Sequence, residues 1–271
     1  MKNKFPFLLL LMLSIFLSCN DASNIKKVEA SVPKEIKLTK PTSTKEKKEM
    51  TTITFPSLDG LEVTADLFHV GDNAPCFVLC HQARFNRTEH TETAKALMAR
   101  GYNCLATDQR SGGVLNDQDN ETAKRATAKG LPTNYLDAEQ DIIAAVNYMA
   151  KKYNQPVILV GSSYSAALGL KVAKENSNVK AILSFSPGEY FGDKLALGKA
   201  IAGLDKPTFI TSSKGEVPTA QPLAKAVNQT MVTHFIPASN GAHGSRVLWS
   251  EQPFSEEYWA AVNGFLTKHG L

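Results

Sequence analysis

Residues 157–169, VILVGSSYSAALG, decide how the rest of the chain is interpreted. The first four residues form an apolar run that predicts a short strand, and the small residues after Ser163 predict a helix. Gly161 and Ser165 flank Ser163 at the spacing of the nucleophile elbow G-x-S-x-G, with serine replacing the second glycine. A serine on so tight a turn has a strained backbone, so small residues must surround it. The stretch predicts either a nucleophile at a helix N-terminus or an ordinary strand–turn–helix with chance serines.

The segments around this turn alternate between strand and helix patterns. Residues 51–55 and 61–70 alternate apolar and polar side chains about a turn, and predict an antiparallel hairpin. A continuous apolar run predicts a strand buried on both faces at residues 76–80. Further strands are expected at residues 103–107, 179–185, 207–213 and 231–236. Further helices are expected at residues 88–98, 135–153, 194–204, 220–227 and 255–268. This order predicts an α/β fold with a mostly parallel sheet of about eight strands, helices on both faces and no separate lid domain.

Residues 114–134 are polar, and their apolar residues recur neither at helical spacing nor at every second position as in a strand. We expect them to form a long connection, and connections of this length are more often functional or mobile than idle.

The first 50 residues have the composition of a leader and a linker. Lys2 and Lys4 precede an apolar run, residues 5–17, that is too short and wrongly flanked to span a membrane. Cys19 follows a small residue at the end of this run, which resembles a bacterial lipobox and implies lipidation of Cys19. A plain secretory signal or a signal anchor remains open. We expect a lipoprotein signal peptide at 1–18, a flexible Lys/Glu-rich linker at 19–50 and one domain at 51–271.

The lipobox implies a location in the cell envelope, on the periplasmic or cell-surface side of a bacterial membrane, with the lipid as the membrane contact. The formal net charge of +4 is too small to predict a nucleic-acid partner. Cys76, Cys80 and Cys104 fall on apolar runs, where cysteine behaves as a small hydrophobe. Their odd number precludes complete internal pairing, although a Cys80–Cys104 bridge stays open. No Cys/His spacing predicts a zinc site, so we expect no metal.

A serine nucleophile needs a base, and three histidines follow Ser163. His234 lies within a predicted strand, and His269 lies in the C-terminal tail. His243 lies in the loop SNGAHG just after the last predicted strand. Because α/β sheets place their chemistry in loops at the carboxyl ends of strands, we predict that His243 is the base.

The elbow, the Gly-Ala-His-Gly loop, the antiparallel entry and the strand–helix order together resemble the α/β-hydrolase superfamily. The similarity covers about residues 51–270 and is greatest to the small lidless esterases like dienelactone hydrolase. It implies an acyl-enzyme on Ser163, a small-molecule ester or thioester substrate and no cofactor. It also implies one oxyanion donor at the Tyr164 N–H and another after His81, where Ala83 is the first candidate and Gln82 the second.

The acid that would orient His243 is left open. Relatives often carry Gly-x-x-Asp after the penultimate strand, whereas this chain has SSKGEVP there, without aspartate. Glu216 is the nearest carboxylate, and Glu189 and Asp193 after the preceding strand are alternatives. If the acid is missing, the chain would be a membrane-tethered binding lipoprotein with a degenerate, inactive triad.

Loops at the same edge of the predicted sheet carry further polar residues. We expect Asp108 to tie the neighbouring loop to Arg110. Arg84, Arg87 and Arg110 would lie on the rim of the site, either to attract an anionic substrate or as plain surface. Residues 187–193 are expected to form one wall of an acyl pocket.

Overall fold

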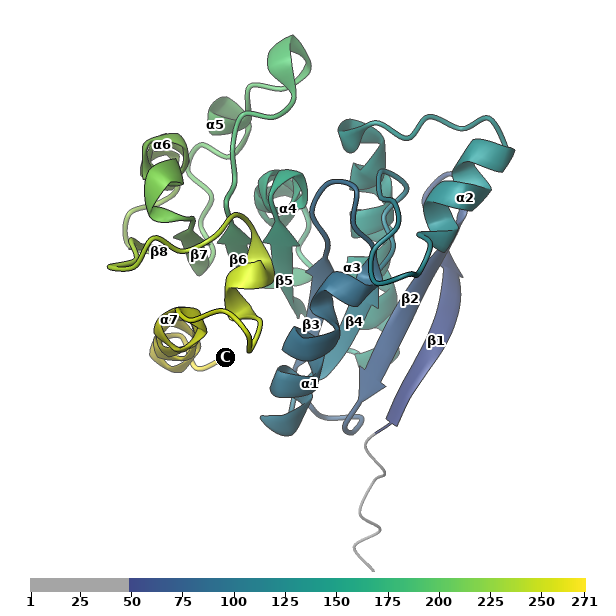
Figure 1. Ribbon diagram of the computed structural model, residues 1–271, viewed down its shortest axis with the longest axis horizontal. Coiled ribbons are helices and arrows are strands. Elements are labelled where there is room, and N and C mark those ends of the chain that lie inside the picture. The colour runs from purple at the N-terminus through teal and green to yellow at the C-terminus, as the bar shows by residue number, and fades with distance from the viewer. Residues whose placement is uncertain (1–48) are drawn as a thin grey trace, which may run out of the picture. The chain divides into compact units, whose positions relative to one another are not determined.

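The computed structural model describes residues 49–271, so the predicted signal peptide, Cys19 and nearly all of the predicted linker lie outside it. One eight-stranded sheet has the order β1-β2-β4-β3-β5-β6-β7-β8 (Figure 1). The strands are β1 (Glu49–Pro56), β2 (Glu62–His69), β3 (Cys76–Cys80), β4 (Asn103–Thr107), β5 (Val157–Ser162), β6 (Val179–Phe185), β7 (Thr208–Thr211) and β8 (Val232–Phe235). β2 pairs antiparallel with β1 and β4, and all other pairs are parallel. The predicted fold class is confirmed.

Helices cover both faces of this sheet. The α-helices are α1 (Thr91–Ala99), α2 (Glu121–Ala128), α3 (Glu139–Tyr153), α4 (Tyr164–Glu175), α5 (Leu197–Ala200), α6 (Val217–Ala226) and α7 (Ser255–Lys268). Short 3-10 turns are η1 (Arg87–His90), η2 (Tyr135–Ala138), η3 (Gly192–Lys194), η4 (Lys214–Glu216) and η5 (Ser245–Leu248). Side chains of α3, α4 and α6 belong to one buried cluster with the sheet, and those of α1 and α7 to another.

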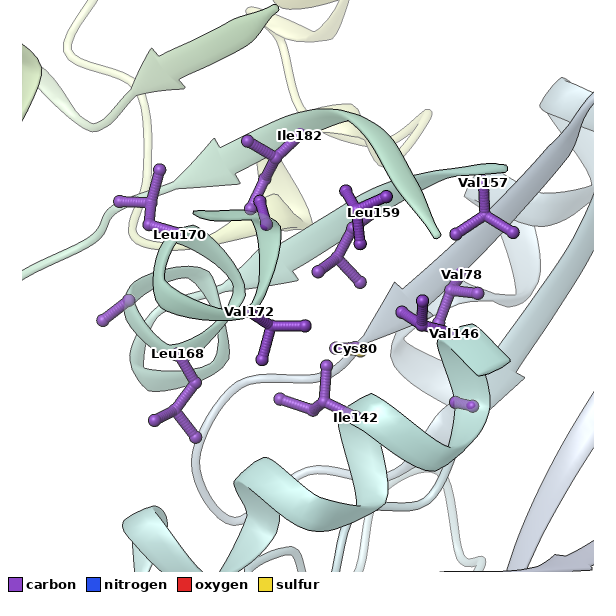
Figure 2. Close-up of a cluster of buried hydrophobic side chains, with 14 of the residues drawn as sticks. Val78, Cys80, Ile142, Val146, Val157, Leu159, Leu168, Leu170, Val172 and Ile182 are labelled. Carbon is purple, nitrogen blue, oxygen red and sulfur yellow. The ribbon is translucent and has the colours of Figure 1, made fainter. Parts of the chain in front are cut away.

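The buried cluster between the sheet and helices α3 and α4 explains why β3 and β5 have continuous apolar sequences. Ile142 of α3 and Leu168 of α4 pack toward alternate residues of β3 and β5, among them Val78 and Leu159 (Figure 2). The residues between these, such as Ile158, belong to the cluster on the opposite face. A strand whose two faces are both buried needs a continuous apolar run, which is the pattern in the sequence.

The secondary-structure predictions hold best for the buried strands and for the last helix. The expected bounds of 76–80, 103–107, 179–185 and 255–268 match β3, β4, β6 and α7. The expectation of a structureless connection over 114–134 is wrong, because it contains α2. The helix expected over 194–204 is also wrong in length, since only the four residues of α5 are α-helical and Lys194 belongs to the short 3-10 turn η3.

Cys76, Cys80 and Cys104 are all buried free thiols, so the open possibility of a Cys80–Cys104 bridge is not realised. Burial raises the pKa of Cys76 to about 11 and that of Cys80 to about 12, and it raises the pKa of Cys104 as well. Within residues 49–271, no helix is both long and apolar enough to cross a membrane.

The expected arginine rim is wrong at two of its three positions. Arg110 is fully buried, and its guanidinium contacts Asp141 at 2.7 Å and Asp59 at 2.7 Å. Arg87 is mostly buried and paired with Asp108, which therefore ties its loop to Arg87 and not to Arg110. A guanidinium that is already neutralised by carboxylates is not available to attract an anionic substrate.

Candidate active site

Ser163 lies at the turn between β5 and α4, where the sequence predicts it. Its backbone has φ 60° and ψ −120°, a strained conformation for a residue with a side chain. The Ser163 N–H donates to the Phe185 carbonyl at 2.8 Å, which fixes the turn to the end of β6. The first N–H groups of α4, which begins at Tyr164, have no acceptor within the helix. Such strain is common where a fold presents a reactive side chain.

Two small residues make this turn possible. A Cβ added to Gly161 would lie 2.5 Å from the Ala166 Cα and from the Ser165 carbonyl oxygen, so only glycine fits. Ser165, which replaces the second glycine of the motif, accepts the Ser162 N–H at 2.9 Å and donates to the Cys80 carbonyl at 2.9 Å. The substitution therefore gives the elbow a hydrogen-bonded link to the end of β3.

His243 and Glu216 are brought together beside this turn. His243 Nδ1 and Glu216 Oε1 are hydrogen bonded, although the two residues come from different loops, after β8 and after β7. His243 is part-exposed, and the contact fixes the tautomer with hydrogen on Nδ1, which leaves Nε2 able to accept a proton.

Ser186 holds the two loops in place, a role that no pattern in the sequence indicates. Its hydroxyl donates to Glu216 Oε2 at 2.8 Å and accepts the Gly244 N–H at 2.9 Å. Ser186 follows β6 directly and has a positive φ of 54°. The residue that anchors Glu216 is therefore also strained, at the same edge of the sheet as Ser163.

The other candidate residues have different partners. The Glu189 carboxylate accepts the N–H groups of Leu197 and Gly198, both at 2.8 Å, and so caps α5. Asp193 forms no ion pair or hydrogen bond with a histidine within the described residues. His234 lies in β8, and the His269 ring packs on Phe265 at the end of α7. The geometry thus pairs His243 with Glu216 rather than with Glu189 or Asp193.

The loop after β3 carries the expected oxyanion donors. The Gln82 N–H already donates to the Glu89 carboxylate at 2.7 Å, so this second candidate is not available. The N–H groups of Ala83 and Tyr164, by contrast, donate no hydrogen bond within residues 49–271. His81 is fully buried, and its ring donates to the Gln82 carbonyl at 2.7 Å. Burial lowers the pKa of His81, which acts as a neutral support of the loop.

Ser163 and His243 form no direct hydrogen bond with each other in the described part of the chain. The Tyr190 hydroxyl lies against the Ser163 side chain and donates to the Ser186 carbonyl at 2.8 Å. Catalytic hydrogen bonds are often long before substrate binds, so this separation is compatible with a nucleophile and its base.

A cavity of about 360 Å³ adjoins the site and contains Tyr190 and Phe191, the residues expected to form an acyl-pocket wall. Tyr135 and Leu136 from the start of η2 line it from the other side. The Tyr135 ring stacks on that of Tyr164 at 4.7 Å between centroids, next to the nucleophile position. The polar residues Asn134, Asp137 and Lys194 complete the lining, and a cavity with both aromatic and polar walls suits a small, partly apolar ligand. The described residues contain no cluster of three side chains able to hold a metal ion.

The ionisation of Glu216 leads to a prediction about acid stability. Burial raises its pKa, but hydrogen bonds from His243, Ser213 and Ser186 outweigh burial and lower the pKa from 4.5 to about 2. A carboxyl whose pKa is lower in the folded state stabilises the fold above its unfolded pKa, and this contribution is lost as pH falls through the folded pKa. We expect the Tm of wild type to exceed that of Glu216→Gln above pH 4.5, and the difference to shrink as pH falls toward 2.

Thermal unfolding at a series of pH values measures this difference. Glu251→Gln, which alters an exposed carboxyl, serves as the control and should show no pH-dependent difference from wild type. A Glu216→Gln difference that stays constant down to pH 2 would contradict the prediction.

Known proteins resemble this chain in sequence pattern and in fold. A family model described as "Dienelactone hydrolase family" matches residues 66–235. An esterase from Pyrococcus furiosus is 16% identical, with a TM-score of 0.61 over 82% of this chain and 91% of its own. A dienelactone hydrolase from Anabaena variabilis is 12% identical, with a TM-score of 0.63 over 82% of this chain and 98% of its own. At identities this low, the structural similarity shows a shared fold and nothing more specific. No curated protein matches the chain.

Proposed function

Because this chain belongs to the dienelactone hydrolase family, we propose that it is a serine hydrolase that cleaves a carboxylic ester or thioester of a small molecule. The pairing of Glu216 with His243 beside the strained Ser163 is the observation that carries the proposal. The fold it shares with an esterase of known structure is consistent with it.

The proposed reaction uses only side chains and backbone groups of this chain. Ser163 Oγ attacks the carbonyl carbon, and His243 Nε2 takes the hydroxyl proton while Glu216 stabilises the imidazolium. The N–H groups of Tyr164 and Ala83 hold the negatively charged oxygen of the tetrahedral intermediate. His243 then passes the proton to the leaving alcohol or thiol, which departs and leaves an acyl group on Ser163. Water, deprotonated by His243, attacks this acyl-enzyme. The bond from the acyl carbon to Ser163 Oγ then breaks, His243 returns the proton to Ser163 Oγ, and the acid leaves.

The acyl group of the substrate would occupy the cavity between Tyr135 and Tyr190. Its volume of about 360 Å³ suits a small substrate rather than a long chain. The alternative of an inactive binding protein is not favoured, because Glu216 provides His243 with a carboxylate partner despite the absence of an aspartate.

The sequence of the first residues supports a further part of the proposal. Cys19 would carry a lipid that tethers the domain to the cell envelope. Both the lipid and the location rest on the lipobox-like pattern alone.

A fluorophosphonate probe tests the proposed nucleophile directly. We expect the probe to label wild type covalently and to leave Ser163→Ala unlabelled, because only an activated serine reacts with it. Ser177→Ala, which changes an exposed serine, should label like wild type. Equal labelling of wild type and Ser163→Ala, measured by intact mass, would overturn the assignment.

A further inference from the structure

Glu89 is a buried carboxylate that the proposed reaction does not use directly. It lies in η1, after the loop that follows β3, and its relative exposure is 1%. Its Oε1 accepts the Ser162 hydroxyl at 2.7 Å and the Ser245 hydroxyl at 2.7 Å. Its Oε2 accepts the Gln82 N–H at 2.7 Å. Both oxygens are therefore occupied by hydrogen bonds of 2.7 Å.

The three donors belong to three separate segments, and each is close in sequence to a proposed working group. Ser162 directly precedes the nucleophile Ser163. Gln82 directly precedes Ala83, the proposed oxyanion donor. Ser245 follows the base His243 by two residues. One carboxylate thus contacts the elbow, the oxyanion loop and the histidine loop, and its most distant partner, Ser245, is 156 residues away in the sequence.

Additional contacts connect the same segments to one another. The Ser245 N–H donates to the Ser162 hydroxyl oxygen at 2.9 Å, which joins the histidine loop to the elbow without Glu89. The Trp249 ring N–H donates to the Glu89 carbonyl at 2.8 Å, which fixes η1 against the segment after His243. A buried, fully hydrogen-bonded network of this kind holds its members in one arrangement, because any displacement leaves a buried polar group unpaired.

From this geometry we propose that Glu89 is the positioning residue that sets the oxyanion loop and the histidine loop relative to Ser163. This inference rests on the proposed function and deepens it. Glu89 does not touch the substrate. It acts by orienting the Gln82–Ala83 peptide and the backbone after His243, and small errors in such positions lower turnover more than they lower substrate binding.

Glu89→Gln and Glu89→Leu separate positioning from simple stabilisation. The side-chain amide introduced by Glu89→Gln can still accept the Gln82 N–H and contact the serine hydroxyls, whereas leucine removes all of these hydrogen bonds. For aryl ester hydrolysis well below Tm, we expect Glu89→Leu to lower kcat by about 10–100-fold with little change in KM. We expect Glu89→Gln to recover a large part of that loss. Glu92→Gln, which changes a nearby carboxylate hydrogen bonded to Ser250, should behave like wild type.

A double-mutant cycle provides a readout that a purely structural role would not move. Ser245→Ala removes one of the Glu89 contacts, so its effect on kcat should be far less than additive with Glu89→Leu. If Glu89→Leu lowers Tm but leaves kcat and KM of the folded protein unchanged, the proposal is overturned. Additive effects of Ser245→Ala and Glu89→Leu on kcat would also overturn it.

Amide hydrogen exchange tests whether Glu89 couples the oxyanion loop to the histidine loop, and this measurement does not depend on enzyme activity. We expect Glu89→Leu to accelerate exchange in both residues 81–85 and residues 241–248, and acceleration confined to the vicinity of residue 89 would overturn the proposal. If wild type neither hydrolyses esters nor reacts with the fluorophosphonate, the proposed function fails. The exchange measurement then still decides whether Glu89 couples the two loops.

Discussion

We expect His243→Ala to lower kcat for ester hydrolysis by about 10⁵–10⁶-fold, with at most a modest change in KM. In the proposed mechanism His243 is the group that takes the Ser163 proton as the carbonyl is attacked, and this variant removes it. In other triads, loss of the base costs about as much as loss of the whole triad. Steady-state kinetics with a short-chain aryl ester measures the effect.

The carboxylate variants extend this experiment to the acid. Glu216→Gln should lower kcat by about 10²–10⁴-fold, because the amide can no longer stabilise the imidazolium or fix its tautomer. Glu189→Gln and Asp193→Asn should stay close to wild type, since Glu189 caps α5 and neither contacts His243. His269→Ala, which changes a histidine at the end of α7, controls for the loss of an imidazole. A wild-type rate in His243→Ala, or selective inactivation of Asp193→Asn, would refute the assignments.

We expect Arg110→Ala to destabilise the domain by about 3–5 kcal/mol, because it leaves the buried Asp141 carboxylate without its cation. For a domain of this size the loss corresponds to a decrease in Tm of roughly 6–20 °C. Arg110 also links the start of the chain to its middle, since the same guanidinium contacts Asp59 near β1 and Asp141 in α3.

Two comparisons show whether the unpaired Asp141 charge causes the loss of stability in Arg110→Ala. Arg110→Ala combined with Asp141→Asn should recover part of the loss, because the remaining buried group is then neutral. Lys124→Ala removes an exposed partner of Asp119 and should leave Tm unchanged. Calorimetry in which Arg110→Ala behaves like Lys124→Ala would contradict the buried-pair interpretation.

The fold could be predicted where burial alone determines the sequence. β3, β4 and β6 are covered on both faces, so their runs are largely apolar and their bounds follow from the sequence. α2 could not be predicted in this way, because its residues are mostly small or polar. Asn120 caps it, and the Thr122 hydroxyl accepts the Thr64 N–H of β2 at 2.9 Å. The bond between Thr122 and Thr64 joins residues far apart in the sequence and leaves no local period.

The candidate site likewise contains residues that could be predicted from local sequence and residues that could not. The elbow at Ser163 is a local motif, so its position could be predicted from its flanking residues alone. The carboxylate facing His243 depends on how the loops after β6 and β7 fold, and one short segment there caps α5 through Glu189. The role of Glu89 is still harder to recognise from the sequence, because an acidic residue in the first turn of a helix is common. Its burial results from segments that meet only in the folded chain.

The three buried thiols make unfolding of this domain chemically visible. Cys76 and Cys80 of β3 pack on the α3 side of the sheet, and Cys104 of β4 packs on the other side. Each is fully buried and protonated at neutral pH, so a thiol reagent cannot modify it while the sheet is intact. The rate at which alkylating agents modify these thiols therefore reports how often the centre of the sheet opens, and does so from both of its faces.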